Sequence, residues 1–343
     1  MPLGRTMGAK PRLVICGTGF PAVRSYLALA LPEVEVLALE VRDLRAGMEA
    51  EVLIPAMARV DGELMDRLSG LRLIQQWGAG LEGVDREAAS TRGIAVANVP
   101  TAGTGNAESV AEWCVLAALA LLRRLSEAER TLRAGTGWGV PMGRSLLGRT
   151  AGIVGLGGIG RALAERLRPF GVRLLAVKRQ PDPPLAERLG LAWLGGMAEL
   201  DTLLAQAEVL FLCLPLNAET RGIIDERALA LLPAGAVLVN PARGALVCEE
   251  ALLRALGEGR LQGAGLDVFG VEPLDPASPL LASPGLVATP HVAGVTDLSY
   301  RGIADGVASN VRRLRSGEPL LNCVNPGHPG RSAEGEVTPP RWR

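Results

Sequence analysis

Histidine and aromatic residues are scarce in this sequence. Only two histidines, His291 and His328, occur in 343 residues, and phenylalanine, tryptophan and tyrosine together make up 3% of the chain. Protein zinc sites need several histidine and cysteine ligands at short spacings, and the five cysteines include no Cys-x-x-Cys pair. We therefore expect no metal site, and any chemistry that needs an imidazole has two candidates.

An excess of charge of one sign is also absent. The chain has 36 basic and 36 acidic side chains, so its formal net charge is zero. Proteins that bind nucleic acid or anionic membranes usually present a strongly basic surface. We therefore predict that neither nucleic acid nor a membrane is a partner.

Long apolar segments are missing as well. The run 113–122 lies within a helix-like stretch at 106–125 and is too short, and too close to charged residues, to span a bilayer. Residues 1–10 lack the apolar core of a secretion signal. The cysteines are scattered and odd in number, which is typical of reduced thiols in a protein core. These features predict a cytoplasmic protein.

Glycine, by contrast, is abundant, with 43 residues, and several glycines gather in one loop. A short apolar strand at 151–154 leads into Gly155-Leu-Gly157-Gly158-Ile159-Gly160, and residues 161–170 then read as a helix that stops at Gly171. In a dinucleotide-binding loop the first glycine permits a tight turn, the second lets the backbone approach a pyrophosphate, and the third allows close packing of helix and strand. The context therefore predicts a dinucleotide site at Gly155, Gly157, Gly158, Ile159 and Gly160.

The residues after the next strand, 172–177, bear on the choice of cofactor. An acidic side chain there would accept from the ribose 2'-hydroxyl of NAD, whereas basic side chains accommodate the 2'-phosphate of NADP. The strand ends in Lys178-Arg179-Gln180, and the first acid is Asp182. We therefore favour NADP(H) over NAD(H) as the cofactor; the alternative is that these basic residues form a solvated strand end.

Three further residues follow strand-like runs: Arg243, Glu272 and His291. The carboxyl ends of parallel strands meet at the ligand-binding edge of a sheet, so we expect these side chains to come together there. The runs that precede them are 236–239, 263–269 and 286–288.

These residue types suit the reduction of a 2-keto acid. The planar guanidinium of Arg243 matches a substrate carboxylate and can polarise the ketone. His291 can protonate the oxygen that forms as hydride arrives, and Glu272 can favour the imidazolium and fix its orientation. Taken singly, each residue also has an ordinary structural interpretation: a surface arginine, a loop cap and a structural histidine.

Together these motifs resemble those of the D-2-hydroxyacid dehydrogenase family. The resemblance covers nearly all of residues 10–325 and includes, in the family's order, the glycine loop, 215–222, Asn240-Pro-Ala-Arg243-Gly, Gly265-Leu-Asp267-Val, Glu272-Pro and Thr289-Pro-His291. It implies that Arg243 holds the substrate, that Glu272 orients the histidine and that His291 is the acid/base catalyst.

The resemblance also implies roles for residues around that centre. It places Asp267 near the nicotinamide carboxamide and assigns Pro215, Thr220, Pro241 and Gly294 to segments that line the cofactor. The loop Gln75-Gln-Trp-Gly-Ala79-Gly80 is similar to the family loop whose backbone amides hold the substrate carboxylate, so Ala79 and Gly80 are its candidate binding residues. Three departures matter. Gly158 stands where many relatives have arginine, and Lys178 and Arg179 replace the acid of the NAD-dependent members. Glu272 argues against formate dehydrogenase, which has glutamine there.

The pattern of the chain predicts the fold class α/β. Strand-like and helix-like segments alternate in the first hundred residues and again from 152 to 288, which is typical of parallel sheets covered by helices. We expect two Rossmann/flavodoxin-like doubly wound domains, and the resemblance implies that the active-site cleft lies between them. The expected boundaries are 1–101 plus 292–325 for a discontinuous substrate-binding domain, 102–291 for the dinucleotide-binding domain, and 326–343 for a flexible tail.

The sequence thus predicts a reductase of a small 2-keto acid, with glyoxylate or hydroxypyruvate favoured, and the resemblance implies a homodimer. One alternative is phosphoglycerate dehydrogenase, for which we expect an added regulatory domain in many members. Another is a dinucleotide-sensing dimer like the corepressors that share this fold, in which turnover would be incidental. Substitution of His291 by alanine would separate an enzyme from such a sensor.

Overall fold

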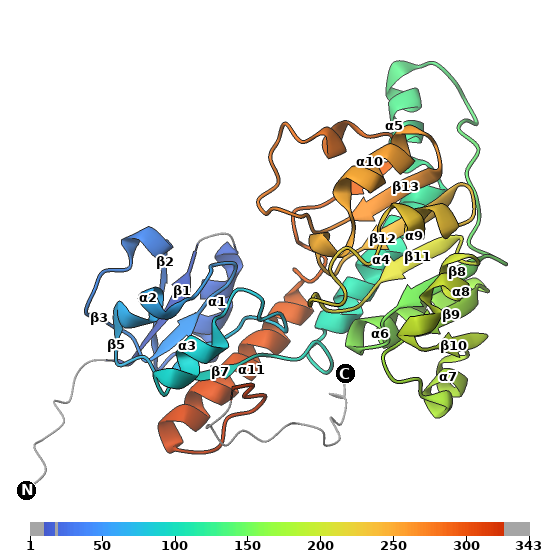
Figure 1. The fold of residues 1–343 in the computed structure, drawn as a ribbon. Coiled ribbons are helices and arrows are strands. Elements are labelled where there is room, and N and C mark those ends of the chain that lie inside the picture. Colours follow the sequence, from blue (N-terminus) through green and yellow to red (C-terminus); the bar gives the residue numbers. More distant parts are fainter. Residues whose placement is uncertain (1–9, 18–19, 326–343) are drawn as a thin grey trace, which may run out of the picture. The chain divides into compact units, whose positions relative to one another are not determined.

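The computed structural model describes residues 10–17 and 20–325, and the predicted tail at 326–343 lies outside them. The chain divides into two compact units (Figure 1): Met1–Asn106 with Asp297–Arg343, and Ala107–Thr296. Both units have parallel sheets and helices, so the predicted α/β class is confirmed. No helix within the described ranges is long and apolar enough to cross a membrane.

The first unit contains a parallel sheet with the strand order β2-β1-β4-β6-β7 among its described residues. This is the flavodoxin-like order, in which the second strand of the chain lies outside the first. The strands are β1 (Arg12–Cys16), β2 (Glu35–Leu39), β4 (Val52–Ile54), β6 (Leu73–Gln75) and β7 (Ala95–Ala97), and a separate parallel pair joins β3 (Met48–Glu49) to β5 (Leu68–Ser69).

Helices from both ends of the chain cover this sheet. The helices of the unit are α1 (Pro21–Ala30), η1 (Val41–Asp43), α2 (Gly62–Asp66), α3 (Arg86–Thr91) and α11 (Asp297–Ser316). Helix α11 packs against α1 and contributes Val307 and Val311 to the same apolar cluster as Leu27. Burial of this apolar face explains why a segment from the end of the chain folds with the first hundred residues.

The second unit contains a larger parallel sheet, with the order β10-β9-β8-β11-β12-β13-β14 in the residues described. It is the Rossmann order with one strand added at the β14 edge. The strands are β8 (Thr150–Val154), β9 (Arg173–Val177), β10 (Trp193–Gly195), β11 (Val209–Leu212), β12 (Ala236–Asn240), β13 (Leu261–Leu266) and β14 (Leu286–Ala288).

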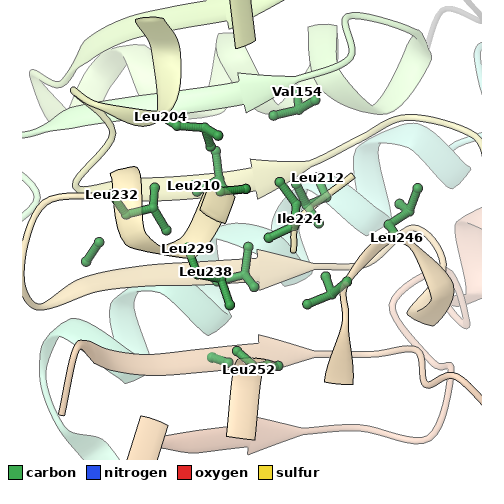
Figure 2. Packing of buried hydrophobic residues seen from close by; sticks show 14 of the residues in the cluster. Val154, Leu204, Leu210, Leu212, Ile224, Leu229, Leu232, Leu238, Leu246 and Leu252 are labelled. Atoms are coloured by element: carbon green, nitrogen blue, oxygen red, sulfur yellow. The ribbon is translucent and has the colours of Figure 1, made fainter. Parts of the chain in front are cut away.

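Apolar side chains cover both faces of this larger sheet. Val154, Leu210 and Leu238 belong to one cluster, part of which Figure 2 shows packed against residues of α9 and α10. Their neighbours Ile153 and Phe211 belong to a second cluster on the other face. Successive strand residues point to opposite faces, so uninterrupted apolar runs are what a sheet buried on both sides requires.

Two helices of this unit, α4 and α5, precede its first strand, and the others lie between its strands. The helices are α4 (Asn106–Leu122), α5 (Leu125–Ala134), α6 (Gly158–Leu167), η2 (Arg168–Phe170), α7 (Pro183–Leu189), η3 (Met197–Glu199), α8 (Leu200–Leu204), α9 (Glu226–Leu231), η4 (Gly244–Leu246), α10 (Glu249–Gly257) and η5 (Pro279–Ala282).

The helix after the glycine loop differs from its predicted bounds of 161–170. Helix α6 begins at Gly158, and a 3-10 turn, η2, replaces its last three predicted residues. Glycine has low helix propensity, which hid the true start, and Pro169 lacks the amide that would continue the α-helical hydrogen bonds. The predicted stop is confirmed, because Gly171 ends η2 in the left-handed region with φ +67°.

The cysteine prediction holds only in part. Cys16, Cys114 and Cys213 are buried, whereas Cys248 and Cys323 are partly exposed. Cys248 immediately precedes α10 and Cys323 lies in the segment beyond α11, and both pack at the margin of an apolar cluster.

Candidate functional site

The glycine loop joins β8 to α6, and two of its glycines are required by the fold itself. Gly155 has φ +98°, and a Cβ there would lie 2.5 Å from the carbonyl oxygen of Cys213 on the neighbouring strand's extension. A Cβ on Gly160 would lie 2.1 Å from the carbonyl oxygen of Gly155. Backbone atoms at these distances cannot move aside, so any side chain at either position would force the turn open.

Gly157 is different, because nothing within the unit requires it to be glycine. Its backbone is extended, with φ −74° and ψ −160°, a conformation that other residues adopt readily. A Cβ at this position would meet no atom within 4 Å. The space beside Gly157 is therefore open, at the N-terminus of α6, where backbone amides and the helix dipole favour an anionic group. A dinucleotide pyrophosphate fits this cradle.

The strand next to the loop, β9, ends in the basic residues predicted to choose the cofactor. Lys178 is partly exposed and Arg179 is exposed, and neither forms an ion pair with an acidic side chain among the described residues. Asp182, the first acid after the strand, caps α7: its Oδ1 accepts from the amide of Leu185 at 3.3 Å. The carboxylate of Asp182 is therefore already hydrogen-bonded as the N-terminal cap of α7.

The loop after β11 is held by its own polar groups. The hydroxyl of Thr220 donates to the carbonyl oxygen of Pro215 at 2.8 Å, and Asn217 Oδ1 accepts from the amide of Thr220 at 3.0 Å. Thr220 is buried and Pro215 is exposed. Of these two predicted cofactor contacts, the threonine shapes the loop and the proline faces outward.

The loop after β12 places Arg243. Asn240 is buried and clamps this loop, since its Oδ1 accepts from the amide of Ala242 at 3.0 Å and its Nδ2 donates to the carbonyl of Arg243 at 2.8 Å. Gly244 then touches the next loop, because a Cβ there would lie 1.9 Å from the carbonyl carbon of Phe269. This close backbone contact brings the loop of Arg243 beside the segment that leads to Glu272; Pro241 is buried in the same turn.

Glu272 and His291 form a pair. Glu272 Oε2 lies 2.8 Å from His291 Nδ1, and Oε1 accepts from the amide of Phe269 at 2.9 Å. The side chains are 19% and 31% exposed, so the pair is sheltered but open to small molecules. Because an ionised carboxylate only accepts, Nδ1 carries the proton in this contact, and Nε2 is the other ring nitrogen.

The electrostatics of this pair favour an ionised Glu272. Burial by itself would raise the pKa of Glu272, but the hydrogen bonds from His291 and the amide of Phe269, with the charge of Arg243, hold its pKa below the ordinary value. The contribution of Arg243 places its guanidinium within electrostatic range of the pair. A cation, a carboxylate and an imidazole therefore share one edge of the sheet.

Asp267 follows β13 and is 1% exposed. Its Oδ1 accepts from Thr289 Oγ1 at 2.6 Å and from the amide of Val292 at 2.8 Å, and its Oδ2 accepts from the amide of Ala293 at 2.8 Å. Burial raises the pKa of Asp267, and these hydrogen bonds oppose that rise. Both carboxylate oxygens are thus committed to the chain around His291, and Gly294 continues the same segment, partly exposed.

The predicted carboxylate-binding loop lies in the first unit, after β6. Ala79 is exposed, Gly80 is partly exposed, and the carbonyl of Ala79 accepts from Asn98 Nδ2 at 2.8 Å. Nearby, the Oε1 atom of Gln76 is buried without a hydrogen-bond partner among the described residues. The role predicted for the amides of Ala79 and Gly80 stays a prediction, and Gln76 adds a buried acceptor that the sequence did not single out.

Three residues of the second unit shape this site without having been predicted to do so: Asn240, Gly244 and Thr289. All three occur in the quoted motifs, so their positions were visible; Asn240 bonds within its own loop, whereas Gly244 and Thr289 contact Phe269 and Asp267 on another segment. Within the described ranges, no group of three or more histidine, cysteine, aspartate or glutamate residues is placed to hold a metal ion.

Comparison with known proteins now identifies the family. The family model for the D-isomer specific 2-hydroxyacid dehydrogenase NAD binding domain matches residues 115–293. A glyoxylate reductase of Thermococcus litoralis is 36% identical over 286 residues, which are 81% of this chain and 84% of the relative.

A D-3-phosphoglycerate dehydrogenase of Mycobacterium bovis is 38% identical over 86% of this chain, but the chain spans only 54% of that relative's length. Among solved structures, an NADPH-dependent glyoxylate/hydroxypyruvate reductase of Sinorhizobium meliloti, in complex with NADP and malonate, is 32% identical with a TM-score of 0.78, covering 95% of this chain and all of that one. The chain therefore belongs to the D-isomer specific 2-hydroxyacid dehydrogenase family.

Proposed function

We propose that this protein reduces a small 2-keto acid to the corresponding 2-hydroxy acid, with glyoxylate or hydroxypyruvate as the favoured substrate. The observation that supports this best is the 2.8 Å contact between His291 Nδ1 and Glu272 Oε2, within electrostatic range of Arg243. A dinucleotide-type glycine loop in the same unit supports it too.

The residues divide the reaction between them. A bound reduced nicotinamide would supply the hydride that forms the new C–H bond at the keto carbon. Arg243 binds the substrate carboxylate and polarises the carbonyl, so negative charge can develop on the oxygen. His291 Nε2 donates the proton that completes the hydroxyl group, and Glu272 stabilises the imidazolium beforehand. Within the first unit, the amides of Ala79 and Gly80 are the groups that we propose for binding a carboxylate.

We propose NADP(H) as the preferred cofactor. Lys178 and Arg179 lie at the end of β9 without an acidic partner, and a 2'-phosphate would give them one. Asp182 is already engaged as the cap of α7. An acid that caps a helix is a poor candidate for a ribose hydroxyl, so the strand end offers cations and no competing carboxylate.

The test combines substrates and cofactors. Initial rates are measured for glyoxylate, hydroxypyruvate, pyruvate and 3-phosphohydroxypyruvate, each with NADPH and NADH. Turnover of glyoxylate or hydroxypyruvate with NADPH supports the proposal. A clear preference for the phosphorylated acid would replace it by phosphoglycerate dehydrogenase, the activity of the longer relatives.

Variants sharpen the cofactor assignment. Lys178→Ala with Arg179→Ala should raise the KM for NADPH about tenfold or more and leave the KM for NADH within about twofold, because only NADPH has the extra phosphate. Asp182→Asn is the matched control, since asparagine also caps helices and its KM values should stay unchanged. Equal losses for both cofactors in the double variant would refute the NADP assignment.

We propose that the assembly is a homodimer formed through the region around α4 and α5. Leu116, Leu132, Trp138 and Met142 are all strongly exposed here, Trp138 at 91%. A second copy would cover these apolar side chains.

Light scattering after size exclusion tests this assembly. A mass of two chains for the wild type, and of one chain for Trp138→Ser with Met142→Ser, supports the proposed surface. A wild type of one chain refutes the dimer, and a double variant that still has a mass of two chains refutes this surface.

A dinucleotide-sensing dimer is the competing function, and His291→Ala distinguishes it. In an enzyme, this variant loses turnover but still binds cofactor. In a sensor, turnover by the wild type is negligible and the variant still dimerises on cofactor.

A further inference from the structure

The backbone at His291 is unusual and needs a cause. Its φ is +56°, in the left-handed region, which few residues other than glycine adopt, although asparagine, aspartate and histidine do so more often than the rest. The conformation therefore depends on contacts that hold it. Because the side chain of His291 starts from this backbone, the same contacts determine where the imidazole lies.

Those contacts come mainly from one residue, Asp267. The amide of His291 donates to the backbone carbonyl of Asp267 at 2.8 Å, and the next two amides, of Val292 and Ala293, donate to its carboxylate at 2.8 Å each. Three consecutive amides thus converge on a single aspartate. Such a ring of donors around a buried carboxylate fixes the turn in one conformation.

Thr289 in turn holds the carboxylate of Asp267. Its Oγ1 donates to Asp267 Oδ1 at 2.6 Å, a short contact typical of a charge-assisted hydrogen bond. Its amide continues the sheet by donating to the carbonyl of Leu266 at 3.0 Å, so the hydroxyl starts from a fixed backbone. Thr289 also faces the turn directly, because its carbonyl accepts from the amide of His291 at 3.1 Å.

We propose that Thr289 is a positioning residue: its hydroxyl orients the Asp267 carboxylate, and the carboxylate holds the left-handed turn that sets His291 Nδ1 against Glu272. The chain of contacts runs from Thr289 Oγ1 through Asp267 to the amides of Val292 and Ala293. Thr289 itself touches no reacting group. This inference rests on the proposed function, in which His291 exchanges the proton.

The test compares Thr289→Val, which keeps the branched shape but loses the hydroxyl, with Thr289→Ser, which keeps the hydroxyl. Thr91→Val is the matched control: Thr91 Oγ1 donates to the carbonyl of Ala88 in α3, outside the site. We expect kcat to fall about 10–100-fold in Thr289→Val, since misplacement of a catalytic group by about 1 Å has that effect. The dissociation constant of NADPH should stay within about twofold of the wild type.

Two readouts separate positioning from general damage. The kinetic isotope effect with 4-deuterated NADPH should increase in Thr289→Val, because the chemical step becomes slower than product release. Thr289→Ser and Thr91→Val should resemble the wild type in both kcat and isotope effect. If Thr289→Val and Thr289→Ser lose the same activity, or Thr289→Val loses less than about twofold, the proposal is wrong.

A third readout does not depend on turnover. The sequence has two histidines, so His328→Gln leaves His291 as the only imidazole in NMR spectra of the protein without cofactor. We expect its Cε1–Hε1 signal to shift or broaden in Thr289→Val and to stay in place in Thr289→Ser. An unchanged signal would overturn the proposal even if the wild type turned over none of the keto acids.

A second variant keeps the test possible if Thr289→Val does not fold. If Thr289→Val cannot be purified folded, Thr289→Cys replaces it, since a thiol is close in size to the hydroxyl but a weaker donor. A smaller loss in the same direction is then expected, and activity and signal equal to those of Thr289→Ser would refute the proposal.

Discussion

The glycine loop after β8 and the histidine turn after β14 both lie at the carboxyl edge of the same sheet, yet they are built in opposite ways. The glycine loop is formed by the absence of side chains, since Gly155 and Gly160 pack backbone against backbone. The histidine turn is formed by side chains, since Thr289 and Asp267 hold it through hydrogen bonds. A loop of the first kind should fail when an atom is added, and a turn of the second kind should fail when a polar atom is removed.

The largest effect should come from His291 itself. His291→Asn should lower kcat for keto acid reduction about 10²–10⁴-fold, because the general acid is lost. The dissociation constant of NADPH, measured by fluorescence titration, should change less than about twofold. A parallel loss of NADPH binding would contradict the proposal that the glycine loop binds the cofactor and that the histidine turn supplies the proton.

Gly160→Ala should be the next most severe. Its Cβ would lie 2.1 Å from the carbonyl oxygen of Gly155, so the turn and α6 must separate. We expect the free energy of unfolding to fall by about 1–3 kcal/mol, as in other overpacked sites. Urea denaturation measures this, and a variant as stable as the wild type would show that the contact relaxes freely.

Gly157→Ala should affect binding and not folding. Its backbone conformation suits alanine and its Cβ meets no atom within 4 Å, so the free energy of unfolding should change by less than about 0.5 kcal/mol. The methyl group would occupy the space proposed for the pyrophosphate. The dissociation constant of NADPH should therefore rise about tenfold, equivalent to about 1.4 kcal/mol. If the dissociation constant of NADPH is unchanged, the pyrophosphate does not bind beside Gly157.

The smallest effect should appear in the acid stability of the histidine turn. The pKa of Glu272 is lower in the folded protein than its ordinary value of 4.5, so the unfolded chain takes up a proton first as the pH falls. The ionised carboxylate therefore stabilises the fold above about pH 4.5, and this stabilisation is lost as the pH falls through the lowered pKa.

The comparison of wild type and Glu272→Gln isolates that contribution. The wild type should exceed the variant in free energy of unfolding at pH 7, and the difference should shrink towards pH 3. A difference that is the same at both values would mean that the Glu272 carboxylate does not respond to the environment described above.

The two loops also differ in how far they could be predicted from the sequence. Gly155, Gly157 and Gly160 form a local pattern between a strand and a helix, so the loop could be located, although the start of α6 at Gly158 was missed. Glycine's weak helix propensity disguised that start. Strands β8, β9 and β12 could be found because residues buried on both faces give continuous apolar runs.

The hydrogen bonds of the histidine turn could not be predicted in the same way. Arg243, Glu272 and His291 were placed by their positions after strands, and the structure brings Glu272 and His291 into contact. The link between Thr289 and Asp267 joins residues 22 positions apart, and it depends on the register of β13 with β14. Periodicity identifies strands but not their neighbours, so a contact across two strand ends has no local signal in the sequence.

The helix cap at Asp182 has a consequence for how this chain could change over time. The residue that stabilises α7 and the residues at the end of β9 are separate positions. Substitution of Lys178 or Arg179 would therefore leave the cap of α7 in place. Under the proposed cofactor assignment, the preference for NADP or NAD could change during evolution at positions that do not stabilise this helix.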